Sequence, residues 1–196
     1  MKNMLIHNPA KQDNVEAMAD AMVESMRYVN PSVDYPDVSS VKQDDGVVAE
    51  WFYKAYTGTA PTSELTAILQ YTQQRMVFDE ISETFLGIAL TEMKHYDRLG
   101  EIIQKLGGKV ERPSYSAAKV TVTTVSPQEA IRINIASEQA TIDDYNELIK
   151  VITDNNPKIT HTAEIAVQLI NKIIADEQVH VRLLTDLLNS LPDEQQ

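Results

Sequence analysis

Two copies of the pattern Glu-x-x-His are the residues of this sequence best suited to carry chemistry. They are Glu92 with His95 and Glu177 with His180. Residues three positions apart lie on the same side of an α-helix, so each copy presents a carboxylate and an imidazole together. Both copies fall in the hydrophobic seams of expected helices, where an unpaired charge is costly to bury. A bound metal ion offsets that cost, so we interpret both copies as metal-ligand pairs.

Four long helices are expected to position these pairs. Along them, apolar residues recur at alternating spacings of four and three, which is typical of helices in an antiparallel bundle. The helices are expected over residues 62–78, 79–106, 126–154 and 160–191. Their ends are indicated by Pro61-Thr62, Gly107-Gly108, Ser126-Pro127 and Asn155-Asn156-Pro157. Each seam has a polar break that includes a glutamate, and these are Glu64, Glu92, Glu138 and Glu177.

The positions of these glutamates predict that they meet at one level of the bundle. In an antiparallel pair of helices, residues at the same height are equidistant from the turn. Glu64 and Glu92 have their midpoint at residue 78, where the first helix gives way to the second. Glu138 and Glu177 have theirs at 157.5, beside Pro157, although that turn is placed from Pro and Asn alone. Within each pair, the two glutamates are therefore expected at the same height of the bundle, with the turns left where the other residues place them.

The fold class predicted is all-α, an antiparallel four-helix bundle with one long crossover connection and an N-terminal helical extension. The bundle is expected over residues 59–196, with its crossover over residues 109–126. The extension is expected over residues 1–58, with short helices at 14–28 and 46–56.

Composition limits the partners of this chain. It has 196 residues, a formal net charge of −12 and no cysteine. An acidic chain is poorly suited to nucleic acid or to an anionic membrane, because both require basic patches. No apolar run approaches the ~20 residues of a membrane span. The lack of cysteine excludes disulfides and zinc–thiolate sites and fits a cytoplasmic location.

The expected cluster contains four carboxylates and two imidazoles. Two divalent ions would balance the charge of the four carboxylates, so the buried cluster would be neutral. Oxygen and nitrogen ligands without thiolate suit iron or manganese. A glutamate from each of two helices and a Glu-x-x-His from each of the other two is the ligand pattern of di-iron and di-manganese bundle proteins. We therefore expect two metal ions of either kind in this cluster.

Residues 61–191 resemble the ferritin-like superfamily, of the rubrerythrin and bacterioferritin type with a di-iron carboxylate domain. The segments that carry the resemblance are Ser63–Tyr71 (SELTAILQY), Glu92-Met-Lys-His95 and Asp176-Glu-Gln-Val-His180. The resemblance implies two Fe ions, with two Mn ions as the alternative. It also implies two bridging carboxylates, two terminal carboxylates and one imidazole for each metal. The bridging carboxylates would be Glu92 and Glu177, and the terminal carboxylates Glu64 and Glu138. The imidazoles would be those of His95 and His180.

Three further residues take roles from the resemblance. Tyr71 is similar to a tyrosine often found close to such sites, so we expect it to be catalytic. Asp176 resembles the residue that holds the imidazole of the opposite motif, here His95. At the matching position before Glu92 this chain has Thr91, which leaves the partner of His180 undefined.

The resemblance implies an oxidoreductase, and we expect rubrerythrin-like reduction of hydrogen peroxide. Because the chain has no cysteine, it lacks the rubredoxin module of rubrerythrins, so a separate electron-donor protein is expected. Manganese catalase-like dismutation, ferroxidase activity with dioxygen and a purely structural metal site are the alternatives. Thr141 stands where rubrerythrins often have an extra glutamate, which counts against the strict rubrerythrin assignment. We also expect a homodimer, with Trp51 and Phe52 as candidate interface residues, and no ferritin-type cage, because only five residues follow Leu191.

Overall fold

The computed structural model describes residues 27–110, 116, 119–120, 124 and 126–192, and every element found there is helical. The helix expected over 14–28 lies almost entirely outside the described residues. The elements in chain order are η1 (Val38–Ser40), η2 (Ala49–Phe52), α2 (Tyr53–Tyr56), α3 (Glu64–Gln74), α4 (Asp79–Lys105), α5 (Pro127–Asn155) and α6 (His161–Ser190). The predicted all-α class is therefore confirmed.

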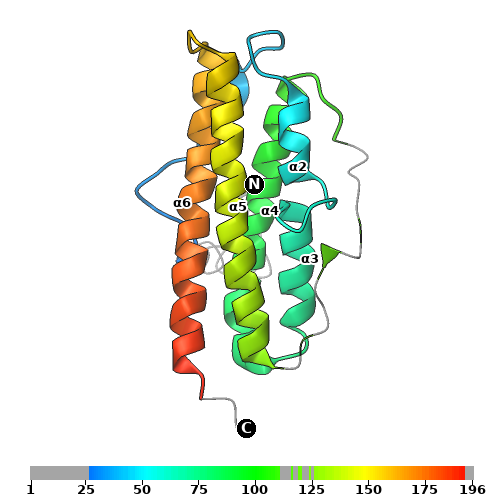
Figure 1. Ribbon diagram of the computed structural model, residues 1–196, viewed down its shortest axis with the longest axis vertical. Coiled ribbons are helices and arrows are strands. Elements are labelled where there is room, and N and C mark those ends of the chain that lie inside the picture. Colours follow the sequence, from blue (N-terminus) through cyan, green and yellow to red (C-terminus); the bar gives the residue numbers. More distant parts are fainter. Residues whose placement is uncertain (1–26, 111–115, 117–118, 121–123, 125, 193–196) are drawn as a thin grey trace, which may run out of the picture.

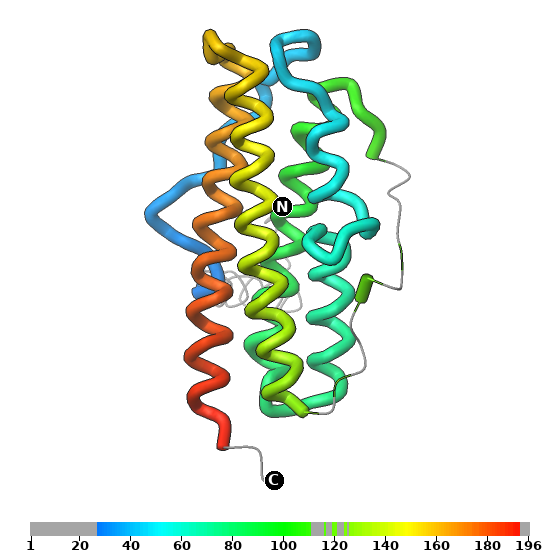
Figure 2. The backbone as a smooth tube through the Cα atoms, viewed as in Figure 1, coloured from blue at the N-terminus to red at the C-terminus, as the bar shows by residue number. Residues whose placement is uncertain are grey.

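Four columns of helix lie side by side (Figure 1). Helices α4, α5 and α6 each form one column, and the fourth consists of α2 stacked above the shorter α3. Helix α3 pairs with α4 and α5 pairs with α6, each pair antiparallel, as the backbone tube shows (Figure 2). Helix α4 ends at the opposite end of the molecule from the start of α5, so their connection crosses the length of the bundle. Both predicted hairpins and the crossover are confirmed.

Helix α3 is shorter than the 62–78 predicted and spans Glu64–Gln74. It begins later because Ser63 is its N-cap, with the Ser63 hydroxyl accepting the Thr66 N–H at 3.3 Å. The same kind of cap starts α5, where Ser126 caps the helix as predicted. Local side-chain hydrogen bonds therefore fix where these helices begin.

Helix α4 ends close to the predicted glycine pair. Gly107 has a φ of 80°, a backbone conformation that glycine adopts without strain. The Gly107 N–H donates to the Gln104 carbonyl at 3.0 Å, and the Gly108 N–H donates to the Ile103 carbonyl at 2.8 Å. These two bonds form a Schellman motif, which satisfies carbonyls that the helix end would leave unpaired.

The segment before α3 packs into the bundle. Phe52 and Tyr56 are 0% and 4% exposed and belong to the same hydrophobic cluster as Leu99 and Ile102 of α4. Phe52 is therefore a core residue of its own chain, and the expectation that it lies at a subunit interface is wrong. Trp51 is partly buried against the same cluster. The extension thus completes the column that α3 is too short to fill.

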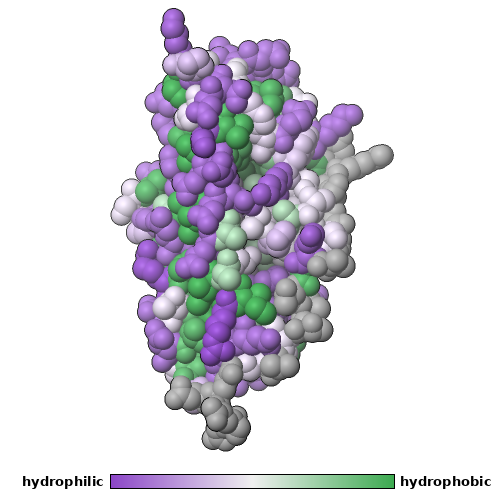
Figure 3. All heavy atoms as spheres, in the orientation of Figure 1, coloured by the Kyte–Doolittle hydropathy of each residue, from purple (hydrophilic) through white to green (hydrophobic). Residues whose placement is uncertain are grey.

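The hydrophobic seams face inward, and polar residues interrupt them at mid-height. One hydrophobic cluster includes the C-terminal half of α4 and the N-terminal half of α6, and the other includes the opposite halves. Figure 3 shows that the face over α5 and α6 is mainly hydrophilic, with a narrow strip of hydrophobic residues along the two helices. None of the described helices is long and apolar enough to span a membrane.

Candidate metal centre

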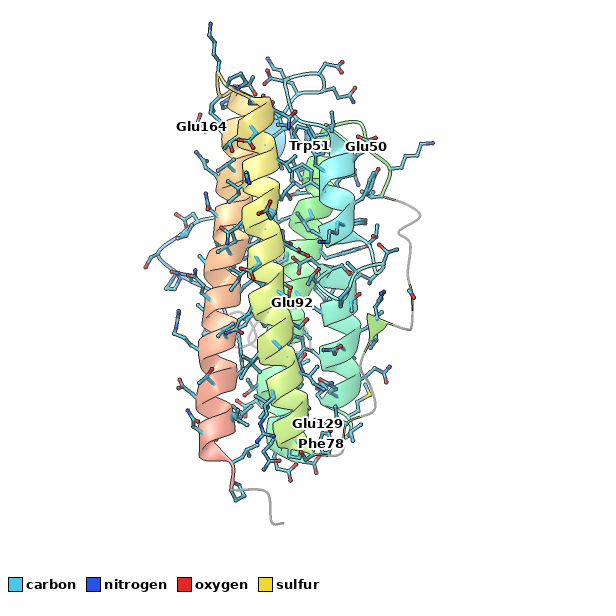
Figure 4. All side chains as sticks on the ribbon, in the orientation of Figure 1. Glu50, Trp51, Phe78, Glu92, Glu129 and Glu164 are labelled. Atoms are coloured by element: carbon cyan, nitrogen blue, oxygen red, sulfur yellow. The ribbon has the colours of Figure 1, made fainter. Side chains whose placement is uncertain are left out.

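The six predicted ligand residues converge between the two hydrophobic clusters. They form two overlapping groups, and within each group the ligand atoms all lie within 4.8 Å of one another. The first group is Glu64, Glu92, His95 and Glu177, and the second is Glu92, Glu138, Glu177 and His180. All six residues are buried. Figure 4 shows Glu92 at mid-height of the bundle.

Around His95, three carboxylates converge on one ring nitrogen. The His95 Nδ1 atom lies 3.1 Å from Glu177 Oε1, 3.2 Å from Glu92 Oε2 and 3.6 Å from Glu64 Oε2. One N–H can donate well to only one of these oxygens. Several lone pairs aimed at one small volume is the arrangement that a cation requires.

Around His180 the arrangement is repeated. The His180 Nδ1 atom lies 2.9 Å from Glu177 Oε2, 3.0 Å from Glu92 Oε1 and 3.9 Å from Glu138 Oε1. Glu92 and Glu177 therefore turn one oxygen toward each histidine. A carboxylate placed in this way can bridge two ions, one beside each imidazole.

Two tyrosines hold the two outer carboxylates. The Tyr71 hydroxyl of α3 donates to Glu138 of α5, and the Tyr145 hydroxyl of α5 donates to Glu64 of α3. Each tyrosine lies seven residues after the glutamate of its own helix, so the two halves of the centre repeat the same design. Tyr71 therefore lies next to the cluster, as expected, and Tyr145 shares its position in the other half.

The outer carboxylates favour their protonated forms when no ion is bound. Burial, and then the charge of Glu92, raises the pKa of Glu64 well above its usual range. Burial, and then the charge of Glu177, does the same to the pKa of Glu138. Both groups therefore bind protons more readily than an exposed glutamate does.

The shared carboxylates and the imidazoles favour their charged forms. Burial raises the pKa of Glu92 and of Glu177, but the facing histidines outweigh it and hold both values below the usual range. Burial lowers the pKa of His180, but Glu177 and Glu92 outweigh it and raise the value to about 9. The pKa of His95 is likewise raised, against burial, by Tyr35 and the surrounding carboxylates. Two negative and two positive groups then leave the cluster neutral.

The cluster fits two divalent cations. Glu92 Oε1 and Glu177 Oε1 are buried and form no hydrogen bond of good geometry, although each lies within 3.1 Å of an imidazole nitrogen. Buried polar atoms are normally paired, so two such atoms in one cluster need an explanation. Bound cations explain both atoms, and the oxygen and nitrogen ligand set suits iron or manganese.

The far nitrogens of the two histidines differ. His95 Nε2 lies 3.3 Å from Asp176 Oδ2, as the family resemblance implied. His180 Nε2 is buried and has no hydrogen-bond partner among the described residues. Thr91, at the position matching Asp176, instead donates its hydroxyl to the Gly87 carbonyl at 3.3 Å. The presence of Thr91 in place of an aspartate therefore leaves His180 Nε2 without the carboxylate partner that His95 Nε2 has.

Sequence reasoning missed two residues of this surrounding, Tyr35 and Lys172. Both bond to Asp176, at 2.8 Å and 2.7 Å respectively. Lys172 could have been found, because a lysine four residues before an aspartate on a helix predicts an ion pair. Tyr35 lies in an irregular segment and carries no comparable signal.

A small cavity between α3 and α5 reaches the cluster. Its volume is about 10 Å³, enough for one water molecule. It touches Glu64, Glu92 and Glu138, and the rest of its lining is largely polar, including Thr62, Ser63, Gln70, Asn134, Ser137 and Thr141. This cavity places space for a water molecule beside the two outer carboxylates.

Comparison with known proteins identifies a family and relatives to which this chain is similar. The model of a family described as the ferritin-like domain matches residues 59–193. A bacterioferritin from Desulfovibrio desulfuricans is 29% identical over 127 residues, which cover 62% of this chain and 66% of that protein. The chain therefore matches slightly less than two thirds of that relative's length.

Solved structures of bacterioferritins also resemble this chain. The X-ray structure of the Desulfovibrio desulfuricans bacterioferritin, whose di-iron site was studied in different catalytic states, has a TM-score of 0.60 at 25% identity and covers 72% of this chain and 77% of that one. The bacterioferritin BfrA of Mycobacterium tuberculosis has a TM-score of 0.60 at 24% identity and covers 75% of this chain and 87% of that one. At this identity the likeness supports the fold and no shared role. Because the family model spans more than half of the chain, this protein belongs to the ferritin-like family.

Proposed function

We propose that this protein binds two ferrous ions in the cluster and oxidises them with dioxygen, as a ferroxidase. The observation that carries the proposal is the pair of overlapping ligand groups that share Glu92 and Glu177. The similarity to bacterioferritins supports iron handling ahead of the other reactions considered from the sequence. Iron is then a substrate as well as an occupant of the site.

The stoichiometry of the proposed reaction follows from two one-electron donors side by side. Two ferrous ions each give one electron to one dioxygen molecule, which takes up two protons and leaves as hydrogen peroxide. Glu92 and Glu177 hold the two ions together, so both electrons are delivered in a single encounter. Glu64 and Glu138 lie along the polar cavity, and each completes the binding of one ion.

The role of Tyr71 is proposed in a narrower form than catalysis. Its hydroxyl bonds to Glu138, so it positions that carboxylate. Tyr145 positions Glu64 in the same way. Both tyrosines are buried, and burial raises the pKa of each, so each hydroxyl keeps the proton that it donates.

Rubrerythrin-like peroxide reduction with a separate donor protein, and manganese catalase-like dismutation, are the alternatives that the same ligands permit. One observation counts against the rubrerythrin reading. Thr141, where an extra glutamate is common in rubrerythrins, donates its hydroxyl to the Ser137 carbonyl at 3.0 Å and supplies no carboxylate. For that reason we place ferroxidase activity first.

The test is anaerobic loading of the apoprotein with Fe²⁺, followed by addition of dioxygen or hydrogen peroxide with and without a reductant. We expect rapid formation of Fe³⁺ and uptake of one dioxygen for about two iron ions. Peroxide turnover only with reductant would support a peroxidase instead, and turnover without it would support dismutation. Glu92→Ala should abolish iron binding at both positions. Glu101→Ala, a partly exposed glutamate on the same helix, is the matched control and should bind two ions.

A homodimer is also proposed, through the outer face of α4. Leu86, Leu90 and Met93 are 38%, 44% and 44% exposed, and their spacing places them on one face of that helix. An exposed apolar stripe of this kind is typical of an interface.

The cytoplasmic location expected from the sequence stays a prediction.

A further inference from the structure

The two halves of the cluster differ in how their histidines are held. In the half that contains His95, Asp176 is 0% exposed and accepts four hydrogen bonds. Its Oδ2 atom faces His95 Nε2 at 3.3 Å and accepts from the Tyr35 hydroxyl at 2.8 Å. Its Oδ1 atom accepts from the Asn30 N–H at 2.6 Å and from Lys172 Nζ at 2.7 Å. These four partners fix the carboxylate in one orientation.

Two of the four partners come from the segment before the region matched by the family model. Asn30 also accepts a hydrogen bond from Lys172 Nζ through its carbonyl at 2.8 Å, which closes a ring of bonds with Asp176. Two cations lie over the Tyr35 ring, with Lys94 Nζ 4.5 Å and Lys172 Nζ 5.0 Å from its centroid. The Asp176 network, comprising Asn30, Tyr35, Lys172 and Asp176, is therefore rigid as well as fully satisfied.

This network determines how His95 faces the cluster. With a carboxylate on Nε2, that nitrogen carries the proton it donates, and Nδ1 is left as the ligand atom. The ring is also prevented from rotating, so its ligand atom is already in place before an ion arrives.

In the other half nothing equivalent is present among the described residues. His180 Nε2 is buried without a hydrogen-bond partner, and Thr91 bonds to its own helix. A buried N–H without a partner is unfavourable, and no described residue bonds to Nε2 to fix the tautomer of the ring from that side. The ligand atom of His180 is therefore less well prepared than that of His95.

We propose that Tyr35 and Asn30 are positioning residues for His95 and that they make the two ion positions unequal, with tight binding beside His95 and weaker, exchangeable binding beside His180. The inference rests on the proposed binding of two ions. The ion beside His95 would then remain bound while the ion beside His180 exchanges with solution, which suits a site that releases oxidised iron. The segment that tightens the first position lies outside the family match at residues 59–193.

The test is a Co²⁺ titration of the full-length apoprotein, followed by visible absorption and by calorimetry. We expect two resolved binding steps in the unchanged protein. Tyr35→Phe removes one hydroxyl and keeps the ring, and it should weaken the tight step by about 10-fold to 100-fold, the usual effect of losing a partner of a metal-bound histidine. The weak step should not change. His180→Ala should keep the tight step and lose the weak one.

Two further variants separate positioning from general stability. Tyr56→Phe changes another buried tyrosine that precedes the family match, whose hydroxyl donates to the Val110 carbonyl at 3.4 Å and not to Asp176, and it should alter neither step. Thr91→Asp supplies the missing acid beside His180 and should strengthen the weak step. A single binding constant for both ions, or equal weakening of both steps in Tyr35→Phe, would overturn this inference and leave the proposed function standing. No saturable Co²⁺ binding at all would overturn both.

Discussion

Loading the apoprotein with two divalent ions should release about four protons at neutral pH, because metal ligands must be deprotonated. The number follows from the directions of the pKa shifts. Without ions, Glu64 and Glu138 hold protons because their pKa values are raised. His95 and His180 also hold protons, since the pKa of His180 is about 9 and that of His95 is raised as well. Two ions therefore replace four protons, and the buried cluster is neutral before and after.

The sign of the pH dependence follows from this exchange. Each proton released makes the apparent affinity rise about tenfold for each pH unit, so two per ion give about 100-fold. Binding should therefore weaken steeply as the pH falls from 8 to 6. Above the pKa of His180 one proton fewer is released, and the slope becomes shallower.

Calorimetry in buffers of different ionisation enthalpy measures the protons released for each ion bound. In the variant Glu138→Gln the outer group carries no exchangeable proton, so the release should fall by about one proton per chain. Release of one proton or none by the unchanged protein would refute the protonation states assigned to the cluster. Equal release by Glu138→Gln would refute the role of that carboxylate.

Three other predictions concern the scaffold. Gly87→Ala in α4 should lower the free energy of unfolding in urea by about 1–3 kcal/mol, because the added carbon would lie 2.1 Å from the Tyr28 ring. Alanine normally favours a helix over glycine, so increased stability would show that this contact is absent. Lys172→Met should destabilise the apoprotein by about 1–3 kcal/mol, because it removes one of the two cationic groups that bond to the buried Asp176 and leaves only His95. Adding Asp176→Asn should restore part of the loss, and a double variant no more stable than the single one would contradict the pairing. Leu90→Asp should convert a dimer to a monomer of 22.0 kDa by light scattering, and a monomeric unchanged protein would reject the dimer.

The sequence predicted the bundle and brought the six cluster residues together, because helix geometry converts spacing directly into position. Glu92 and His95 share a face by their spacing, and the equal distances of Glu64 and Glu92 from their turn set them at one height. Ile81 and Phe85 continue the same seam and are fully buried. These features depend on local periodicity, which a single sequence displays.

Features that depend on long-range contacts of irregular segments could not be predicted. The Tyr35 hydroxyl reaches Asp176 across 141 positions of the sequence, from a segment without periodicity. The early end of α3 and the stacking of α2 above it likewise follow from tertiary packing. The bond from Tyr145 to Glu64 requires knowing how α3 and α5 face each other across the cluster.

Anomalous diffraction at the iron absorption edge, from crystals loaded with Fe²⁺ under anaerobic conditions, tests the central claim most directly. Two peaks per chain are predicted, one beside His95 Nδ1 and one beside His180 Nδ1, with Glu92 and Glu177 between them. A single peak, or peaks only on the protein surface, would contradict a di-iron centre in this bundle.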